Sequence, residues 1–144
     1  MNKIETYIHK VQYYETDQMK IVHHSNYIRW FEEARVDFLD QIGLSYFSLE
    51  EMGIASPVLG IECNYQSMVR FGDAVKIYCT IDTFTGVKFS VKYKIVDAKD
   101  ETLRATGSSK HCFINSEGKP IHLKRENDEA YSIFKNLVDN KKQD

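Results

Sequence analysis

The chain has 144 residues, a formal net charge of -2 and 42% hydrophobic residues, which are ordinary values for one globular domain. A protein that binds nucleic acid or an anionic membrane surface usually carries a basic stripe, so the slightly acidic balance argues against both partners. Nowhere does the chain approach the roughly 20 apolar residues of a membrane-spanning helix, and its first ten residues lack the apolar segment of an export signal. We therefore expect a single cytoplasmic domain over residues 1–144.

The first third of the chain predicts a strand followed by the longest helix. Residues 4–14 are rich in Tyr, Ile and Val, which favour strands. Over residues 26–42, apolar side chains recur at spacings of three and four, which predicts a helix of about 17 residues with one apolar face. Ser25 or Asn26 is expected to cap the start of this helix, and Gly43 to end it.

The remainder of the chain alternates apolar and polar residues with a period of two, as half-buried strands do. Ser48 and Glu51 stand at capping-box spacing and predict one short extra turn before Gly53. Residues 128–140 have helical spacing and predict a short C-terminal helix. Short connections, including RFGD at 70–73, are expected to make successive strands antiparallel neighbours. The predicted strands are residues 59–65, 75–81, 89–95 and 102–115.

These elements limit the possible architectures. A five-stranded antiparallel sheet has a face that must be covered, and one long helix is available to cover it. We therefore predict an α+β fold in which a curved sheet wraps around that helix. The sheet still leaves an edge strand and part of the helix open. Pairing two copies would cover both, so we expect at least a dimer.

The cysteines and three of the histidines are predicted to be structural. An odd number of widely spaced cysteines favours reduced core thiols over a disulfide framework. A histidine that stands alone in its segment is more often a hydrogen-bonded structural residue than a ligand. The residues concerned are Cys63, Cys79, Cys112, His9, His111 and His122.

The segment TDQMKIVHH carries the residues with the clearest chemical potential. Asp17 lies in the loop that leads into the long helix, and His24 lies just before its first turn. The first backbone N–H groups of a helix have no internal partner and carry the positive end of its dipole, so they can bind a developing oxyanion. A nearby carboxylate can activate water as a general base or attack a carbonyl carbon as a nucleophile. Both routes end in hydrolysis.

Structural roles are the alternative for these residues. An Asp before a helix is commonly a turn former or a cap, although nine positions separate Asp17 from Asn26. His23 and His24 could form a metal pair, but adjacent side chains diverge and no HxxxH, CxxC or carboxylate cluster supplies further ligands, so no metal is expected. One of the two histidines is expected to be packed and the other to line the site. The charged residues along the helix are expected to form a solvated face or an interface rim.

The stretch YYETDQMKIVHHSNYIRWFEEAR resembles the signature of the hotdog-fold acyl-CoA thioesterases, in the 4-hydroxybenzoyl-CoA thioesterase-like branch that includes the Tol-Pal-associated enzymes. Weaker similarity continues through NYQSMVRFGDAVKIYCTI and TLRATGSSKHCFINSEGKPIHL. The resemblance implies the hotdog fold, with dimers often paired into tetramers and active sites shared between two protomers. It places Asp17 at the family's catalytic carboxylate. It places His24 at the position whose backbone N–H polarises the thioester carbonyl and whose side chain is also implicated in catalysis.

Two positions depart from the pattern of the family. Lys20 stands where Gly is common, and Met68 stands where Pro is frequent. If the loop requires a positive φ at Lys20, the lysine costs about 1 to 2 kcal/mol there. The loop is then expected to be shaped differently or to be less tight.

Together these features predict hydrolysis of acyl-CoA thioesters to free acid and CoA, with no metal or redox cofactor. Two alternatives stay open: a non-catalytic acyl-CoA or acyl-carrier binding protein on the same fold, and an acyl-carrier-protein thioesterase. The predicted catalytic residues are Asp17 and His24. The predicted substrate contacts are Val22, His23, Ser25, Asn26 and Tyr27. The candidates for holding the CoA phosphates are Arg70, Lys88, Lys110, Lys119 and Lys124.

Overall fold

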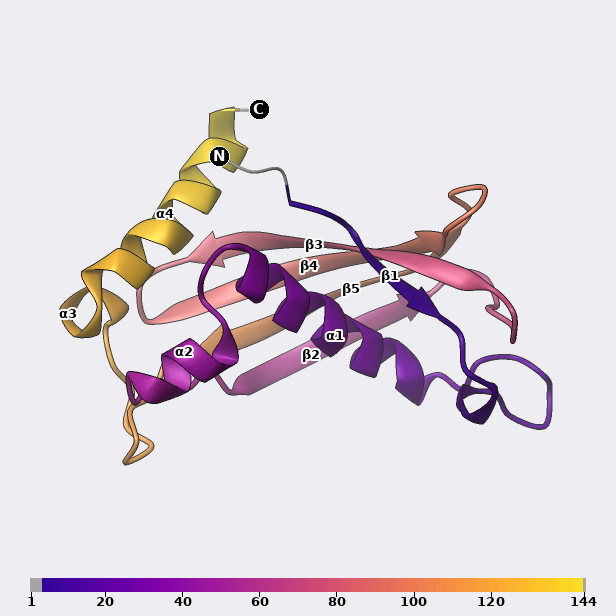
Figure 1. The fold of residues 1–144 in the computed structure, drawn as a ribbon, viewed down its shortest axis with the longest axis horizontal. Helices are drawn as coiled ribbons and strands as arrows, with labels where there is room; N and C mark the ends of the chain where they lie inside the picture. The colour runs from indigo at the N-terminus through magenta and orange to yellow at the C-terminus, as the bar shows by residue number, and fades with distance from the viewer. Residues whose placement is uncertain (1–3, 144) are drawn as a thin grey trace.

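The computed structural model describes residues 4–143 and shows one curved five-stranded antiparallel sheet with a long helix, α1 (Ser25–Gln41), along one face (Figure 1). The predicted α+β class and hotdog fold are confirmed. The strands are β1 (Tyr7–Lys10), β2 (Val58–Tyr65), β3 (Ala74–Phe84), β4 (Lys88–Asp97) and β5 (Leu103–Cys112). The other helices are the 3-10 helix η1 (Tyr13–Glu15), α2 (Tyr46–Glu51), α3 (Leu123–Glu126) and α4 (Asp128–Gln143).

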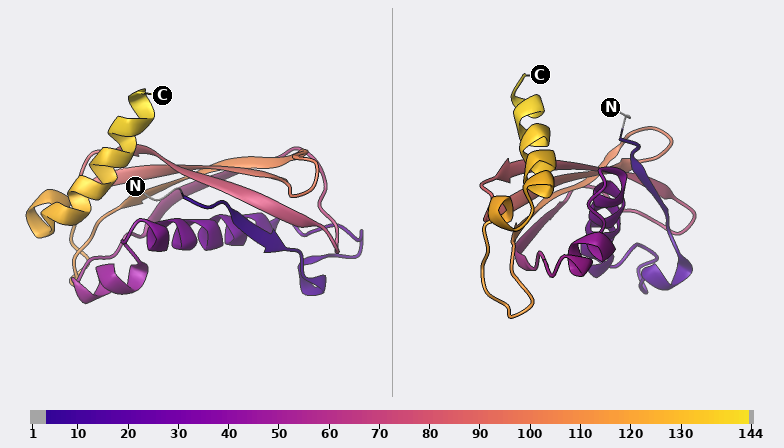
Figure 2. Two further views of the ribbon diagram at one scale, coloured as in Figure 1. Left: turned by 45° about the horizontal axis from the view of Figure 1, so that its top comes forward. Right: turned by 60° about the vertical axis from the view of Figure 1, so that its left-hand side comes forward.

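Helix α1 lies along the sheet because its apolar stripe packs onto the inner face of the sheet (Figure 2). The ring of Phe31 stacks on Tyr93 with centroids 4.3 Å apart and planes 11° apart. Gly107 on β5 makes room for this approach, since a Cβ at that position would lie 2.4 Å from the Phe31 ring. The helix therefore packs against the sheet at a glycine.

The strand order β1-β3-β4-β5-β2 corrects one expectation. The RFGD connection was expected to join neighbouring strands, but β2 pairs with β5 and β3 pairs with β1. Residues 66–73 therefore connect two strands that lie far apart in the sheet. On the way, this segment passes the start of α1, where the Val22 N–H donates to the Val69 carbonyl at 2.8 Å. A short loop in the sequence thus becomes part of the surroundings of the candidate site.

The predicted first strand was too long. β1 ends at Lys10, and the chain turns into η1 because the Glu15 carboxylate accepts the Gln12 N–H at 2.7 Å. Aromatic and β-branched residues over 4–14 indicated a strand. The side chain that turns the backbone away from the strand is that of Glu15, which lies one residue beyond this segment. The turn starts the path toward α1.

The predicted N-terminal caps of the helices were also wrong, although the helices themselves were confirmed. α1 begins after His24 with no side-chain cap, and Ser25 already lies inside the helix. α2 is capped by Ser45, whose Oγ accepts the Ser48 N–H at 3.0 Å, so Ser48 is a helical residue and not the cap. Gly43 follows α1 with φ +86, as predicted for the end of that helix.

The C-terminal helix covers one end of the sheet, at the opposite end of the molecule from the start of α1 (Figure 2). Phe134 of α4 is fully buried and packs against an aromatic cluster with Phe84, Phe89 and Phe113. The preceding short helix α3 was not predicted. Within the described part of the chain, no helix combines the length and the apolar character needed to cross a membrane.

The three cysteines are free and half-buried. Burial raises the pKa of the Cys79 thiol to about 12 and also raises the pKa of Cys63. Neither group is therefore an activated thiolate nucleophile. Their structural role fits the prediction from their spacing.

A chain of buried hydrogen bonds crosses the core beneath α1. Arg35 donates to the Tyr93 hydroxyl at 2.9 Å, Tyr93 and Ser109 are 2.6 Å apart, and Ser109 lies 2.7 Å from His111 Nε2. Because Arg35 can only donate, the simplest proton order has Tyr93 donating to Ser109 and Ser109 donating to an unprotonated Nε2. Arg35 was expected on a solvated face or an interface rim but is 6% exposed, because these buried hydroxyls satisfy it.

This series of hydrogen bonds makes the stability of the protein depend on the charge of His111. Burial lowers the pKa of His111 from 6.5 to about 4, and the Arg35 charge acts in the same direction. Between these values the unfolded state binds more protons than the folded state, so the free energy of unfolding falls as the pH falls, by up to about 3 kcal/mol. Urea unfolding at pH 7, 6 and 5 should show this loss in the wild type and a flatter profile in His111→Gln. Equal slopes would contradict this role of His111.

Candidate active site

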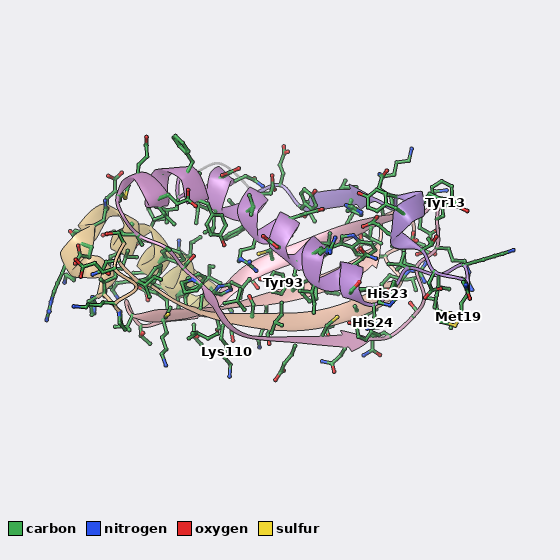
Figure 3. All side chains as sticks on the ribbon, turned by 90° about the horizontal axis from the view of Figure 1, so that it is seen from below. Tyr13, Met19, His23, His24, Tyr93 and Lys110 are labelled. Atoms are coloured by element: carbon green, nitrogen blue, oxygen red, sulfur yellow. The ribbon has the colours of Figure 1, made fainter. Side chains whose placement is uncertain are left out.

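Residues 16–22 form a tight hairpin between η1 and α1. Thr16 and Val22 form an antiparallel bridge at its base, and the Asp17 N–H donates to the Ile21 carbonyl at 2.9 Å. Figure 3 shows Met19 at the outer end of this hairpin, and His23 and His24 at the start of α1 on the same end of the molecule. The hairpin therefore folds Asp17 back beside the residues that lead into the helix.

Asp17 is half-buried, and only one of its two carboxylate oxygens accepts a hydrogen bond from the protein. Its Oδ1 accepts the Met19 N–H at 2.8 Å, which fixes the side chain in an Asx turn. Its Oδ2 has no hydrogen-bond partner among residues 4–143. One oxygen thus holds the side chain in place while the other is available to a ligand or to water.

The backbone N–H of His24 is the open donor at the start of α1. It has no acceptor within the described chain, whereas the next two N–H groups are occupied. The Ser25 N–H donates to His23 Nδ1 at 3.2 Å, and the Asn26 N–H donates to the His23 carbonyl at 3.0 Å. An unpaired N–H at the positive end of a helix dipole is suited to stabilise a developing oxyanion.

The imidazoles of His23 and His24 are both exposed, so the expectation that one of them is packed was wrong. Their rings lie 4.2 Å apart at 30°, and His23 Nδ1 also lies 2.9 Å from the Ser25 hydroxyl. Because Nδ1 accepts the Ser25 N–H, the proton of neutral His23 lies on Nε2. Among residues 4–143, no group of three or more His, Cys, Asp and Glu side chains could hold a metal ion.

Three of the predicted substrate contacts lie beneath the surface of the single chain. Val22 and Tyr27 belong to the hydrophobic core, and Asn26 is buried with its Nδ2 donating to the Glu15 carbonyl at 2.9 Å. These residues support the hairpin and the helix start from below. Contact with a substrate stays a prediction for these three residues and also for His23 and Ser25.

The sequence analysis did not identify an exposed apolar surface around the hairpin. Tyr13 packs edge-on against Phe71 from the 66–73 segment, with centroids 5.6 Å apart. Clustered exposed apolar side chains commonly mark a binding surface. The strand predicted over 4–14 hid Tyr13 and Tyr14, because strand-favouring residue types do not show where a chain turns outward. The most exposed members are Tyr13, Tyr14, Met19, Met68 and Phe71.

The site is open in the single chain. A cavity of about 400 Å³ lies between α1, β3 and α4, but neither Asp17 nor His24 lines it. A ligand at Asp17 would therefore be bound on a surface unless another chain covers it.

Comparison with known proteins decides the family. A family model described as the thioesterase-like superfamily matches residues 11–134, which include the hairpin, α1 and all of the strands from β2 to β5. The chain belongs to the thioesterase-like superfamily. Its fold is thus that of the thioesterase superfamily, while the roles of the candidate site residues and the Tol-Pal-associated branch stay predictions.

Individual members of the superfamily are similar over most of their length. YneP of Bacillus subtilis, named as a candidate acyl-CoA thioesterase, is 32% identical over 116 residues, covering 81% of this chain and 84% of YneP. The acyl-CoA thioester hydrolase YbgC of Escherichia coli O6:H1 is 27% identical over 114 residues, covering 79% and 85%. The crystal structure of a DHNA-CoA thioesterase from Staphylococcus aureus superposes with a TM-score of 0.91 at 29% identity, covering 96% and 93%.

The five basic residues predicted to meet CoA phosphates are all exposed. Lys88 and Lys110 lie on the paired strands β4 and β5, two positions out of register with each other. Arg70 is on the 66–73 segment beside the candidate site. Lys119 and Lys124 lie near α3, at the opposite end of the molecule (Figure 1). On a single chain Arg70 is therefore the best placed of the five, and phosphate binding stays a prediction for each.

Lys20 adopts the conformation that the resemblance suggested. Its φ is +65 in this hairpin, where the superfamily signature commonly has Gly. Lys20→Gly should therefore raise the free energy of unfolding by about 0.5 to 1 kcal/mol, because relief of the left-handed strain exceeds the entropy of the added glycine. Met19→Gly is the matched control on the same exposed hairpin, and chain entropy alone should make it destabilising. Urea unfolding measures both, and a loss of stability in Lys20→Gly would contradict the strain.

Proposed function

We propose that this protein hydrolyses acyl-CoA thioesters to free acid and CoA. The observation that carries the proposal is that an open Asp17 carboxylate oxygen and an unpartnered His24 N–H both occur where one short hairpin leads into α1. The names of the similar acyl-CoA thioesterases support the substrate class. The acyl group itself is not specified by these residues.

In the proposed reaction the thioester carbonyl oxygen accepts the His24 N–H, so the helix dipole stabilises the negative charge that forms there. Asp17 either takes a proton from water, whose oxygen then attacks the carbonyl carbon, or attacks that carbon itself. In both routes the C–S bond breaks and CoA leaves as the thiol after protonation. The second route passes through an acyl–Asp17 anhydride that water hydrolyses. The His24 side chain would help to orient Asp17 or the water.

We further propose that two copies pair to complete the site. β2 is an eight-residue edge strand with exposed apolar side chains at Val58, Leu59 and Tyr65, whereas the other edge strand, β1, has four residues. A long apolar edge is normally covered in a native protein. Sedimentation velocity at micromolar concentration should show a dimer or a tetramer, and a monomer would contradict shared sites.

The competing function is acyl-CoA binding without turnover. The exposed apolar surface around Met19 favours an apolar ligand in either case. The deciding experiment is thiol release from a panel of aliphatic and aryl acyl-CoAs, with the same chains on acyl-carrier protein as a second arm. Binding without thiol release would support the competing function, and release from carrier-bound chains alone would make the protein an acyl-carrier-protein thioesterase. A cytoplasmic location is part of the same proposal.

A further inference from the structure

Glu15, two residues before Asp17, has a buried carboxylate whose two oxygens both accept hydrogen bonds from the protein. It is 4% exposed and accepts three hydrogen bonds. Its Oε1 accepts from His9 Nε2 at 2.8 Å and from the Gln12 N–H at 2.7 Å, and its Oε2 accepts from Trp30 Nε1 at 2.7 Å. These donors belong to β1, to the turn before η1 and to α1. A single side chain therefore joins three segments around the start of the hairpin.

The backbone carbonyl of Glu15 adds a second set of contacts. It accepts the His23 N–H at 2.8 Å and Asn26 Nδ2 at 2.9 Å. His23 immediately precedes the open N–H of His24, and Asn26 lies in the first turn of α1. Glu15 thus holds both the side of the hairpin that carries Asp17 and the start of the helix.

The charge state of Glu15 is set by its neighbours. Burial by itself raises the pKa of Glu15, but the hydrogen bonds from His9, Gln12 and Trp30 outweigh it and bring the pKa below its ordinary value. His9 lies between two carboxylates, because its Nδ1 is 3.0 Å from Glu33 Oε2. The Trp30 ring lies 4.9 Å from that of His9 and packs against it.

We propose that Glu15 is a positioning residue for thioester hydrolysis, fixing the base of the 16–22 hairpin against the start of α1. Asp17 and the His24 N–H must act on the same carbonyl group, and errors of about 1 Å in such a geometry can cost a hundredfold in rate. Glu15 is buried and both of its carboxylate oxygens accept hydrogen bonds from the protein, so its effect on the reaction would pass through those two groups. The inference rests on the proposed function.

The first test is Glu15→Gln, which keeps the shape of the side chain. With its oxygen at the Oε1 position, the amide places an NH2 group against Trp30 Nε1–H, so one hydrogen bond is lost. We expect kcat to fall roughly tenfold to a hundredfold with KM changed less than about twofold. Trp30→Phe removes the Nε1–H donor together with part of a fully buried ring, and is the second variant should Glu15→Gln fold poorly. It should lower kcat severalfold.

Asp97→Asn is the matched control. Asp97 is also buried and accepts three hydrogen bonds, from the Lys99 and Asp100 N–H groups and from Arg104, but it lies at the end of β4. Its variant should lose stability without a change in kcat. An unchanged kcat in Glu15→Gln, or an equal loss in Asp97→Asn, would overturn the positioning role.

Amide hydrogen exchange separates this inference from the proposed function. The His23 N–H, held by the Glu15 carbonyl, should exchange at least about tenfold faster in Glu15→Gln and at the wild-type rate in Asp97→Asn. Unchanged exchange in Glu15→Gln would refute the tie between the hairpin and the helix. A wild-type protein that releases no thiol from any acyl-CoA would instead refute the proposed function, whatever the exchange rates.

Discussion

Asp17→Asn is expected to lower kcat for acyl-CoA hydrolysis by at least about a hundredfold, with little change in KM or in stability. Asparagine keeps an oxygen that can accept the Met19 N–H, which donates to Asp17 Oδ1 at 2.8 Å, so the turn is preserved. The amide can neither accept a proton from water nor attack a carbonyl carbon. Thiol release measured over a range of substrate concentrations separates kcat from KM.

Asp73→Asn provides the control for this loss. Asp73 also lies in a loop at this end of the molecule and accepts a backbone N–H, from Arg70 at 2.9 Å. Its variant should hydrolyse acyl-CoA at about the wild-type rate. If Asp17→Asn retains wild-type turnover, or if both variants lose it equally, Asp17 is not the catalytic carboxylate.

Gly107→Ala is expected to destabilise the fold by about 1 to 3 kcal/mol through overpacking. A Cβ at Gly107 would lie 2.4 Å from the Phe31 ring and 2.5 Å from the backbone carbonyl oxygen of Glu62. The ring could move, but the carbonyl belongs to β2, which is hydrogen-bonded to β5 at this point. Relief therefore requires a shift of the strand or of α1. Urea unfolding at pH 7 measures the difference.

Gly60→Ala is the matched control for the contact at Gly107. Gly60 lies on the adjacent strand β2, and a Cβ there would meet no atom within 4 Å. This variant should be neutral or slightly stabilising, because alanine has less chain entropy to lose on folding. Equal destabilisation by the two variants would mean that the close approach of α1 is not what requires glycine at 107.

Much of the architecture could be predicted from periodicity. The spacing of three and four over 26–42 placed α1 within one residue at each end, because a helix with one buried face must repeat its apolar residues in that way. The period of two located β2 to β5 for the same reason. The condition stated for Lys20, a positive φ, is met at +65, and the expected difference in loop shape stays a prediction.

Asp17 and His24 were predicted as catalytic residues because a carboxylate close in sequence to a helix start can act on a carbonyl group bound there. In the structure Asp17 lies in the hairpin and His24 lies directly before α1. Their catalytic roles stay predictions. The contribution of Glu15 could not be read from the sequence, because its five partners are spread from His9 to Trp30. The sequence shows how many hydrogen bonds a side chain can make, but it does not show which partners the fold will bring to that side chain.

The amino-acid sequence by itself determined which face of α1 is apolar and where α1 and the strands β2 to β4 lie along the chain, since these depend on near neighbours. Only the tertiary structure decided that β2 pairs with β5, that Arg35 is buried against Tyr93, and that Glu15 holds the hairpin. Each of these choices joins residues distant in the chain. Such pairings depend on how whole elements pack together, and local patterns do not specify the partner.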